Sequence, residues 1–236
     1  MSRLVLLSGW GCDARIWDPL APHWSAGVEV STPDWPGYGD AAPLATPDAL
    51  DKLAAAMTPA LPGEALWVGW SLGGLLAAAL LEHLPPPRGL VLLGCAPRFT
   101  LGPVSPEELA GFRRAFARDP HATWRHFLRH QLGGEPAPRQ AHVRLRDLLG
   151  ETPPASLATL EAGLAQLAQL DIGAILAAPP CPIRRLRGAR DPLLPAAQPD
   201  ETLLEEAGHC PQLSRPAALA RHLEALLEEL SGERLA

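Results

Sequence analysis

The sequence has little positive charge and no long hydrophobic run, and each shortage excludes a class of protein. Its 236 residues include 20 Lys and Arg against 26 Asp and Glu, a formal net charge of −6. This balance argues against nucleic-acid binding through overall charge. No apolar run approaches the roughly 18–20 residues that a membrane helix needs, and Leu4 to Leu7 is too short for a signal peptide. We therefore expect a cytoplasmic protein without nucleic-acid or membrane partners.

Cysteines are few and far apart, and no two form a CxxC pair: Cys12, Cys95, Cys181 and Cys210. This spacing matches no metal site, and reduced thiols are usual in cytosolic proteins. We expect neither a metal nor another cofactor. A hydrophobic fraction of 47% and a charged fraction of 19% are typical of a folded protein. The length suffices for one domain with a sizeable core, which we expect to be a monomer.

Short apolar runs alternate with longer helical patterns, which predicts an α/β fold with a mostly parallel sheet flanked by helices. The expected strands are 4–8, 28–32, 66–70, 89–94, 183–186 and 202–205, with helices at 48–57, 72–84 and 216–230. Between 98 and 171 only helical patterns occur, at 106–118, 121–131, 138–149 and 156–170. We therefore expect an α/β core of residues 1–97 and 172–236, with residues 98–171 inserted as a helical lid.

The segment around Ser71 carries the clearest sign of chemistry. Gly69-Trp70-Ser71-Leu72-Gly73 matches G-x-S-x-G between an expected strand and an expected helix, which is the context that the motif requires. Small residues two before and two after the serine let it occupy a strained turn, and the helix N-terminus favours negative charge nearby. The pattern predicts Ser71 as a catalytic nucleophile. The alternative is a tight turn in which Ser71 only caps the helix.

A catalytic serine needs a base, and the base needs an acid that orients it. In folds of this kind the acid and then the histidine follow the serine along the chain. His209 lies on the expected loop before the final helix, whereas His222 lies within that helix and is expected to face solvent. We therefore expect His209 to be the base.

Asp191 is the expected acid, because it follows the strand 183–186 at the end where α/β sheets carry their sites. The alternative for Asp191 is an Asx-turn before proline. Asp200 also lies between that strand and His209, and is the alternative acid.

Acyl transfer also needs backbone N–H groups aimed at the oxyanion. Leu72, the residue after the nucleophile, is expected to supply one. Trp10 is expected to supply the other, because Gly9 and Gly11 let its backbone approach a substrate. The side chains of Trp10 and Trp70 are candidates for the wall of an acyl pocket, with ordinary core packing as the alternative.

Five segments and Trp17 together carry a family resemblance. The segments are Ser8 to Gly11, Gly69 to Gly74, Ala162 to Asp171, Gly188 to Asp191 and Ala207 to Pro211. They resemble the pimeloyl-[acyl-carrier protein] methyl ester esterases of biotin synthesis along nearly the whole chain. The resemblance implies an α/β-hydrolase fold and a serine carboxylesterase that releases methanol from a C7 dicarboxyl chain held on acyl-carrier protein. It also implies Trp10 and Leu72 as oxyanion donors. The family usually has histidine where this chain has Ser8, a position that supports the oxyanion loop.

Acyl-carrier protein is strongly acidic, so an enzyme that acts on it should offer positive charge. Residues 98–150 contain nine arginines and five acids, a local charge of +4 that leaves −10 for the remainder. We expect a docking surface for the carrier on the lid, formed by Arg113, Arg114, Arg125 and Arg129. The alternative is that these arginines are only solvated.

Two other functions stay open. A broad-specificity short-chain carboxylesterase or thioesterase would use the same triad with a different pocket. A non-catalytic relative that binds a ligand or partner would share the fold, but the complete set of Ser71, Asp191 and His209 argues against it.

Overall fold

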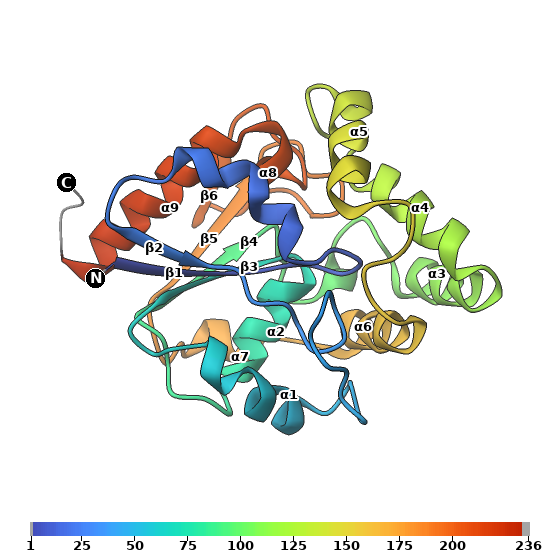
Figure 1. The fold of residues 1–236 in the computed structure, drawn as a ribbon, viewed down its shortest axis with the longest axis horizontal. Coiled ribbons are helices and arrows are strands. Elements are labelled where there is room, and N and C mark those ends of the chain that lie inside the picture. Colours follow the sequence, from blue (N-terminus) through green and yellow to red (C-terminus); the bar gives the residue numbers. More distant parts are fainter. Residues whose placement is uncertain (1, 233–236) are drawn as a thin grey trace.

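The computed structural model describes residues 2–232, so residue 1 and residues 233–236 of the expected core lie outside it. Its strands form one parallel sheet in the order β2-β1-β3-β4-β5-β6 (Figure 1). They are β1 (Ser2–Leu7), β2 (Val28–Ser31), β3 (Leu66–Trp70), β4 (Gly89–Leu93), β5 (Ile183–Gly188) and β6 (Glu201–Leu204). Every expected strand is present, with its ends within two residues of those predicted.

Helices cover both faces of the sheet, which explains why every residue of the central strands β3 and β4 is buried. On one face in Figure 1 lie the 3-10 helix η1 (Ala14–His23), α8 (Pro211–Ser214) and α9 (Pro216–Ser231). On the other lie α1 (Leu50–Met57), α2 (Leu72–Leu80) and α7 (Gly173–Ala177). Two short 3-10 turns are also present, η2 (Thr58–Ala60) in the core and η3 (Phe99–Leu101) in the segment that follows β4.

Several helices differ from the prediction, and the short helices α7 and α8 were not predicted. Helix α2 ends at Leu80 instead of residue 84, because the next residues tighten into a turn in which His83 and Leu84 donate to the Leu80 carbonyl. No pattern predicted η1, whose Pro19 and Pro22 lack the N–H that an α-helix interior needs. Within residues 2–232, no helix is long and apolar enough to cross a membrane.

Residues 98–171, where only helices were predicted, contain α3 (Pro106–Arg118), α4 (Pro120–His130), α5 (Pro138–Leu149) and α6 (Leu157–Gln169). Their sequences mark their starts: Ser105 and Glu108 form a capping box on α3, and Asp119 caps α4. In Figure 1 these helices gather beyond the carboxyl ends of the strands. We call residues 98–171 the insertion.

The strand order fixes where a site can form. The chain places β2 on one side of β1 and β3 on the other, so the carboxyl ends of β1 and β3 border a switch point of the sheet. Ligands of open α/β sheets bind at such crevices. The loop after β1 carries Trp10 and the turn after β3 carries Ser71, and the insertion covers both.

Candidate active site

Ser71 occupies a strained turn between β3 and α2. Its φ of 55° and ψ of −125° are uncommon for a residue with a side chain, and its N–H donates to the Leu93 carbonyl at 2.9 Å. The turn leaves no room beside it. A Cβ on Gly69 would lie 2.5 Å from a backbone atom of α2, and one on Gly73 would lie 2.4 Å from the Ser8 oxygen. The two glycines of the motif are therefore required sterically.

His209 and Asp191 form a buried pair next to this turn. The distance from His209 Nδ1 to Asp191 Oδ2 is 2.8 Å. Asp191 Oδ1 accepts the Leu193 N–H at 2.9 Å, and the His209 carbonyl accepts Trp70 Nε1–H at 2.7 Å. Among the described residues, His209 Nε2 is buried without a hydrogen-bond partner. This nitrogen is the one that a serine nucleophile uses as its base.

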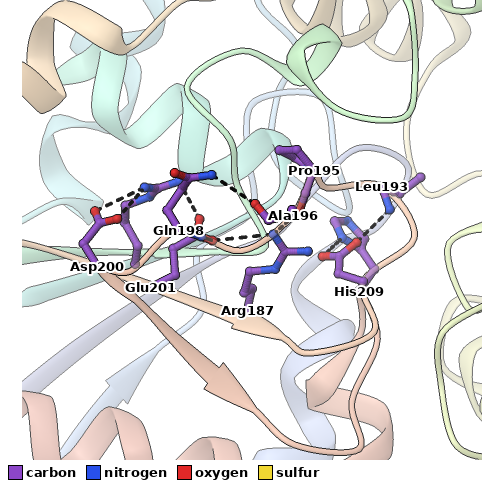
Figure 2. Close-up of polar contacts among 10 residues, drawn as sticks. Arg187, Leu193, Pro195, Ala196, Gln198, Asp200, Glu201 and His209 are labelled. Carbon is purple, nitrogen blue, oxygen red and sulfur yellow. Dashed lines mark hydrogen bonds and ion pairs between the residues drawn. The ribbon is translucent and has the colours of Figure 1, made fainter.

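The alternative acid, Asp200, is directed elsewhere. Its carboxylate accepts hydrogen bonds from Arg185 Nη1 at 3.2 and 3.3 Å. Figure 2 shows Arg187 bonded to the Pro195 carbonyl and paired with Glu201, beside the contacts of His209 and Leu193. These arginines brace the segment between β5 and β6 that contains Asp191. His222 is exposed on α9.

The structure brings Trp10 and Leu72 together beside Ser71. Both approach Gly163 of α6, where an added Cβ would lie 2.8 Å from the Trp10 ring and 3.3 Å from the Leu72 side chain. Leu72 is the first residue of α2, so its N–H has no acceptor within that helix. Trp10 Nε1–H donates to the Leu160 carbonyl at 2.8 Å. The loop after β1 is therefore anchored to the insertion.

Two further bonds fix this loop at Gly11. Its N–H donates to the Tyr38 hydroxyl at 3.2 Å, and its carbonyl accepts Trp124 Nε1–H at 2.9 Å. Burial raises the pKa of the Tyr38 phenol, so this hydroxyl is neutral at physiological pH. At Ser8, Oγ is buried without a partner among residues 2–232, and the carbonyl accepts Trp35 Nε1–H at 2.9 Å.

A cavity of about 260 Å³ lies between the loop after β1 and the loop after β5. Its lining is mostly apolar and comes mainly from the insertion: Trp10, Phe99, Pro103, Val104, Glu108, Leu109, Phe112, His126, Phe127, His130, Leu164, Leu167, Pro192 and Leu193. Trp10 thus lies where an acyl pocket needs a wall, in edge contact with Phe112 and Phe127. Trp70 does not line it. Its indole packs against the His209 ring instead, with ring centroids 5.4 Å apart.

Comparison with known proteins agrees with this geometry. The chain matches the model of the alpha/beta hydrolase family over residues 4–222. It is 36% identical to the pimeloyl-[acyl-carrier protein] methyl ester esterase of Aromatoleum aromaticum, over 94% of this chain and 96% of that protein. It is 32% identical to the protein of the same name from Klebsiella pneumoniae, over 97% and 94%. The chain belongs to this family of α/β hydrolases.

Solved structures support the same fold. An esterase from Thermogutta terrifontis superposes with a TM-score of 0.78 at 22% identity, covering 98% of this chain and 90% of its own. The esterase EaEST from Exiguobacterium antarcticum gives a TM-score of 0.79 at 18% identity, over 97% and 92%. The fold class and the family expected from the sequence are therefore confirmed.

The arginines singled out in the sequence are exposed on this α/β hydrolase: Arg113 and Arg114 on α3, Arg125 and Arg129 on α4. Arg125 and Arg129 also line a second cavity of about 150 Å³, together with His142 and Arg146 of α5. Burial lowers the pKa of His142, and Arg129 and Arg146 lower it further. Within the described part of the chain, no group of His, Cys, Asp or Glu side chains is arranged to hold a metal ion.

Three residues that shape the site were not predicted. Trp124 and Leu160 bind the loop that carries Trp10. Glu135 binds the loop that carries His209. All three belong to the insertion, and no local motif marks any of them. Only the folded contact between distant segments assigns them to the site.

Proposed function

We propose that this α/β hydrolase is a carboxylic ester hydrolase that cleaves the methyl ester of pimeloyl-[acyl-carrier protein] in biotin synthesis. The observation that carries the proposal is the buried His209–Asp191 pair, 2.8 Å apart, beside a strained Ser71. The substrate is supported by relatives that bear this activity in their names and that match at least 94% of the chain, insertion included.

The reaction follows the chemistry of an activated serine. Ser71 Oγ attacks the ester carbonyl while His209 Nε2 takes its proton, and Asp191 holds the imidazole through Nδ1–H. The N–H groups of Trp10 and Leu72 stabilise the oxyanion. His209 then protonates the methoxide, so methanol leaves and an acyl-Ser71 ester remains. Water gives a proton to His209 as it attacks this ester, which frees the carboxylate and restores Ser71.

The apolar cavity of about 260 Å³ is the proposed site of the acyl chain. Burying methylenes in an apolar cavity contributes roughly 0.8 kcal/mol each, so the five methylenes of a pimeloyl chain could contribute up to about 4 kcal/mol. Glu108, His126 and His130 line this cavity and are exposed, which marks its open side along α3 and α4. A chain that enters there comes from a carrier close to α4.

The carrier itself is proposed to dock on the insertion. Arg125 and Arg129 lie on α4, the helix that also presents His126 and His130 at the cavity opening. The cavity that they share with Arg146 has three arginines against one acid, Glu151, which pairs with Arg146, on a chain whose net charge is −6. Complementary charge of this kind steers an acidic partner and orients it. Arg113 and Arg114 extend the basic surface onto α3.

The nearest competing function is a broad short-chain carboxylesterase or thioesterase. It would use the same triad and would need neither the basic surface nor an apolar cavity of this volume. A non-catalytic role is disfavoured, because a binding protein has no need of the strain at Ser71 or of a buried carboxylate on the His209 ring.

Growth rescue tests the proposal. A biotin-requiring bacterial strain that lacks its own esterase would receive the wild-type chain, Ser71→Ala, or Ser31→Ala, a serine at the sheet edge that serves as the matched control. We expect growth without biotin for wild type and Ser31→Ala only, and methanol release from the carrier-bound ester by the purified proteins in the same pattern.

Two results would overturn it in different ways. Full esterase activity in Ser71→Ala would contradict the serine mechanism. Failure of wild type to rescue growth, together with rapid turnover of short-chain aryl esters, would favour the broad esterase.

A further inference from the structure

Glu135 is a buried carboxylate that accepts hydrogen bonds from the backbone on both sides of His209. It lies in the turn between α4 and α5 and is only 4% exposed. Its Oε2 accepts the Gly208 N–H at 3.1 Å and its Oε1 accepts the Cys210 N–H at 2.7 Å. No Lys, Arg or His side chain of residues 2–232 forms an ion pair with it. The carboxylate is thus committed to the His209 loop.

Such an arrangement is costly, which argues that it has a role. An ionised carboxylate without a cationic partner loses several kcal/mol on burial unless hydrogen bonds replace its hydration. Hydrogen bonds from backbone N–H groups to a charged oxygen are stronger than neutral ones, and Glu135 receives two. An apolar residue would cover the loop without this cost but would leave two buried N–H groups unpaired, and a glutamine would offer one acceptor oxygen where Glu135 offers two.

The same part of the insertion holds the other catalytic loop. Trp124 of α4 donates to the Gly11 carbonyl, next to Trp10, and Glu135 follows α4 by five residues. The turn between them is braced by the Glu135 N–H, which donates to the Leu132 carbonyl at 3.1 Å. The base and the oxyanion loop are therefore tied to one helix of the insertion and the turn after it.

We propose that Glu135 is a positioning residue for His209. Its carboxylate fixes the loop that presents the base, and its negative charge stabilises the imidazolium that forms when Ser71 attacks. The proposal rests on the serine hydrolase function above and adds that the insertion, as well as the core, sets the geometry of the base.

The charge can be tested because few other titratable groups surround the imidazole. Asp191 pairs with Nδ1. The nearby thiol of Cys210 stays neutral, because burial and then the charge of Glu135 raise its pKa. Burial likewise raises the pKa of Cys12, which lies close to Cys210. Removing the Glu135 charge should therefore disfavour the protonated form of the His209 imidazole.

The test compares Glu135→Gln and Glu135→Asp with wild type on a short aryl ester, across pH. The control is Glu107→Gln, which removes the same charge from an exposed site on α3. In Glu135→Gln we expect kcat to fall at least tenfold with KM within about twofold, and the acid limb of kcat/KM to move to lower pH. Glu135→Asp keeps the charge on a shorter stem, so its acid limb should return toward wild type while kcat recovers only in part.

Several results would overturn the positioning role while leaving the esterase function intact. One is a Glu135→Gln variant whose kcat and acid limb equal those of wild type. Another is a variant whose kcat falls while its acid limb stays in place. The third is a Glu107→Gln control with the same changes in kcat and acid limb as Glu135→Gln. If Glu135→Gln does not fold, hydrogen exchange of wild type decides. The amides of Gly208 and Cys210 should be as protected as those of β4, and exchange at the rate of an open loop would contradict the clamp. A wild-type protein that hydrolyses no ester, by contrast, would refute the esterase function itself.

Discussion

The core and the insertion build one site in different ways. The core supplies the proposed triad of Ser71, Asp191 and His209 from the ends of its strands, so that any acyl substrate would meet the same chemistry. The insertion supplies the apolar cavity and the basic surface of α4, and it holds the catalytic loops through Trp124 and Glu135. We therefore expect substitutions in the core to affect the hydrolysis of all esters alike, whereas the effect of substitutions on the surface of the insertion should depend on the substrate.

The largest effect is expected in the core, at the orienting acid. Asp191→Asn should lower kcat by about 10⁴ on every ester, because the amide no longer holds the productive tautomer of His209. Asp200→Asn, which only loses its contacts with Arg185, should stay within a few-fold of wild type. Steady-state kinetics on a carrier-bound ester and on an aryl acetate would measure both. A larger loss in Asp200→Asn would reverse the assignment of the acid.

The next effect should be confined to the carrier-bound substrate. Arg125→Glu with Arg129→Glu should lower its kcat/KM by roughly tenfold or more at low salt, because like charges now repel an acidic carrier. Hydrolysis of small esters should not change. Arg221→Glu, an exposed site on α9, is the matched control. Equal losses on carrier-bound and small esters would refute the docking surface.

The cavity should discriminate by chain length. Phe112→Ala removes an aromatic wall of the apolar cavity proposed for the acyl chain. The kcat/KM for a C7 ester should therefore fall by about tenfold, the range expected for lost apolar contact. Turnover of an acetate ester should change little. Val143→Ala, exposed on α5, controls for truncation in the insertion. If acetate turnover fell as much as that of the C7 ester, this cavity would not be the acyl site.

The smallest effect is a pH dependence of stability at His142. Burial and the charges of Arg129 and Arg146 lower its pKa below 6.5 in the folded chain, so the unfolded state binds a proton more readily. The penalty is absent above the unfolded pKa and grows as pH falls from there toward the folded pKa. His142→Gln should therefore gain stability relative to wild type between pH 8 and 5, by less than about 1 kcal/mol. Denaturant melts at both pH values would show it, and a constant difference would contradict it.

The core could be predicted because its signals are local. The buried run of β3 and the glycines around Ser71 lie within a few residues, and Asp191 follows directly from the position of β5. Trp124 and Glu135 could not be predicted in the same way, because their partners lie 113 and 73–75 residues away. A glutamate in a Gly-Gly-Glu-Pro turn resembles any exposed loop residue. The position of Trp70 could not be predicted from the sequence either, because only the folded structure shows that its ring packs against His209.

One comparison tests most directly whether the core supplies the chemistry and the insertion selects the substrate. The wild-type kcat/KM would be measured on the pimeloyl methyl ester bound to acyl-carrier protein and on the same ester without the carrier, at low and high salt. We expect at least about tenfold higher kcat/KM for the carrier-bound ester at low salt, and a smaller difference at high salt because salt screens the α4 arginines. Equal values at both salt concentrations would contradict the claim that the insertion selects the substrate.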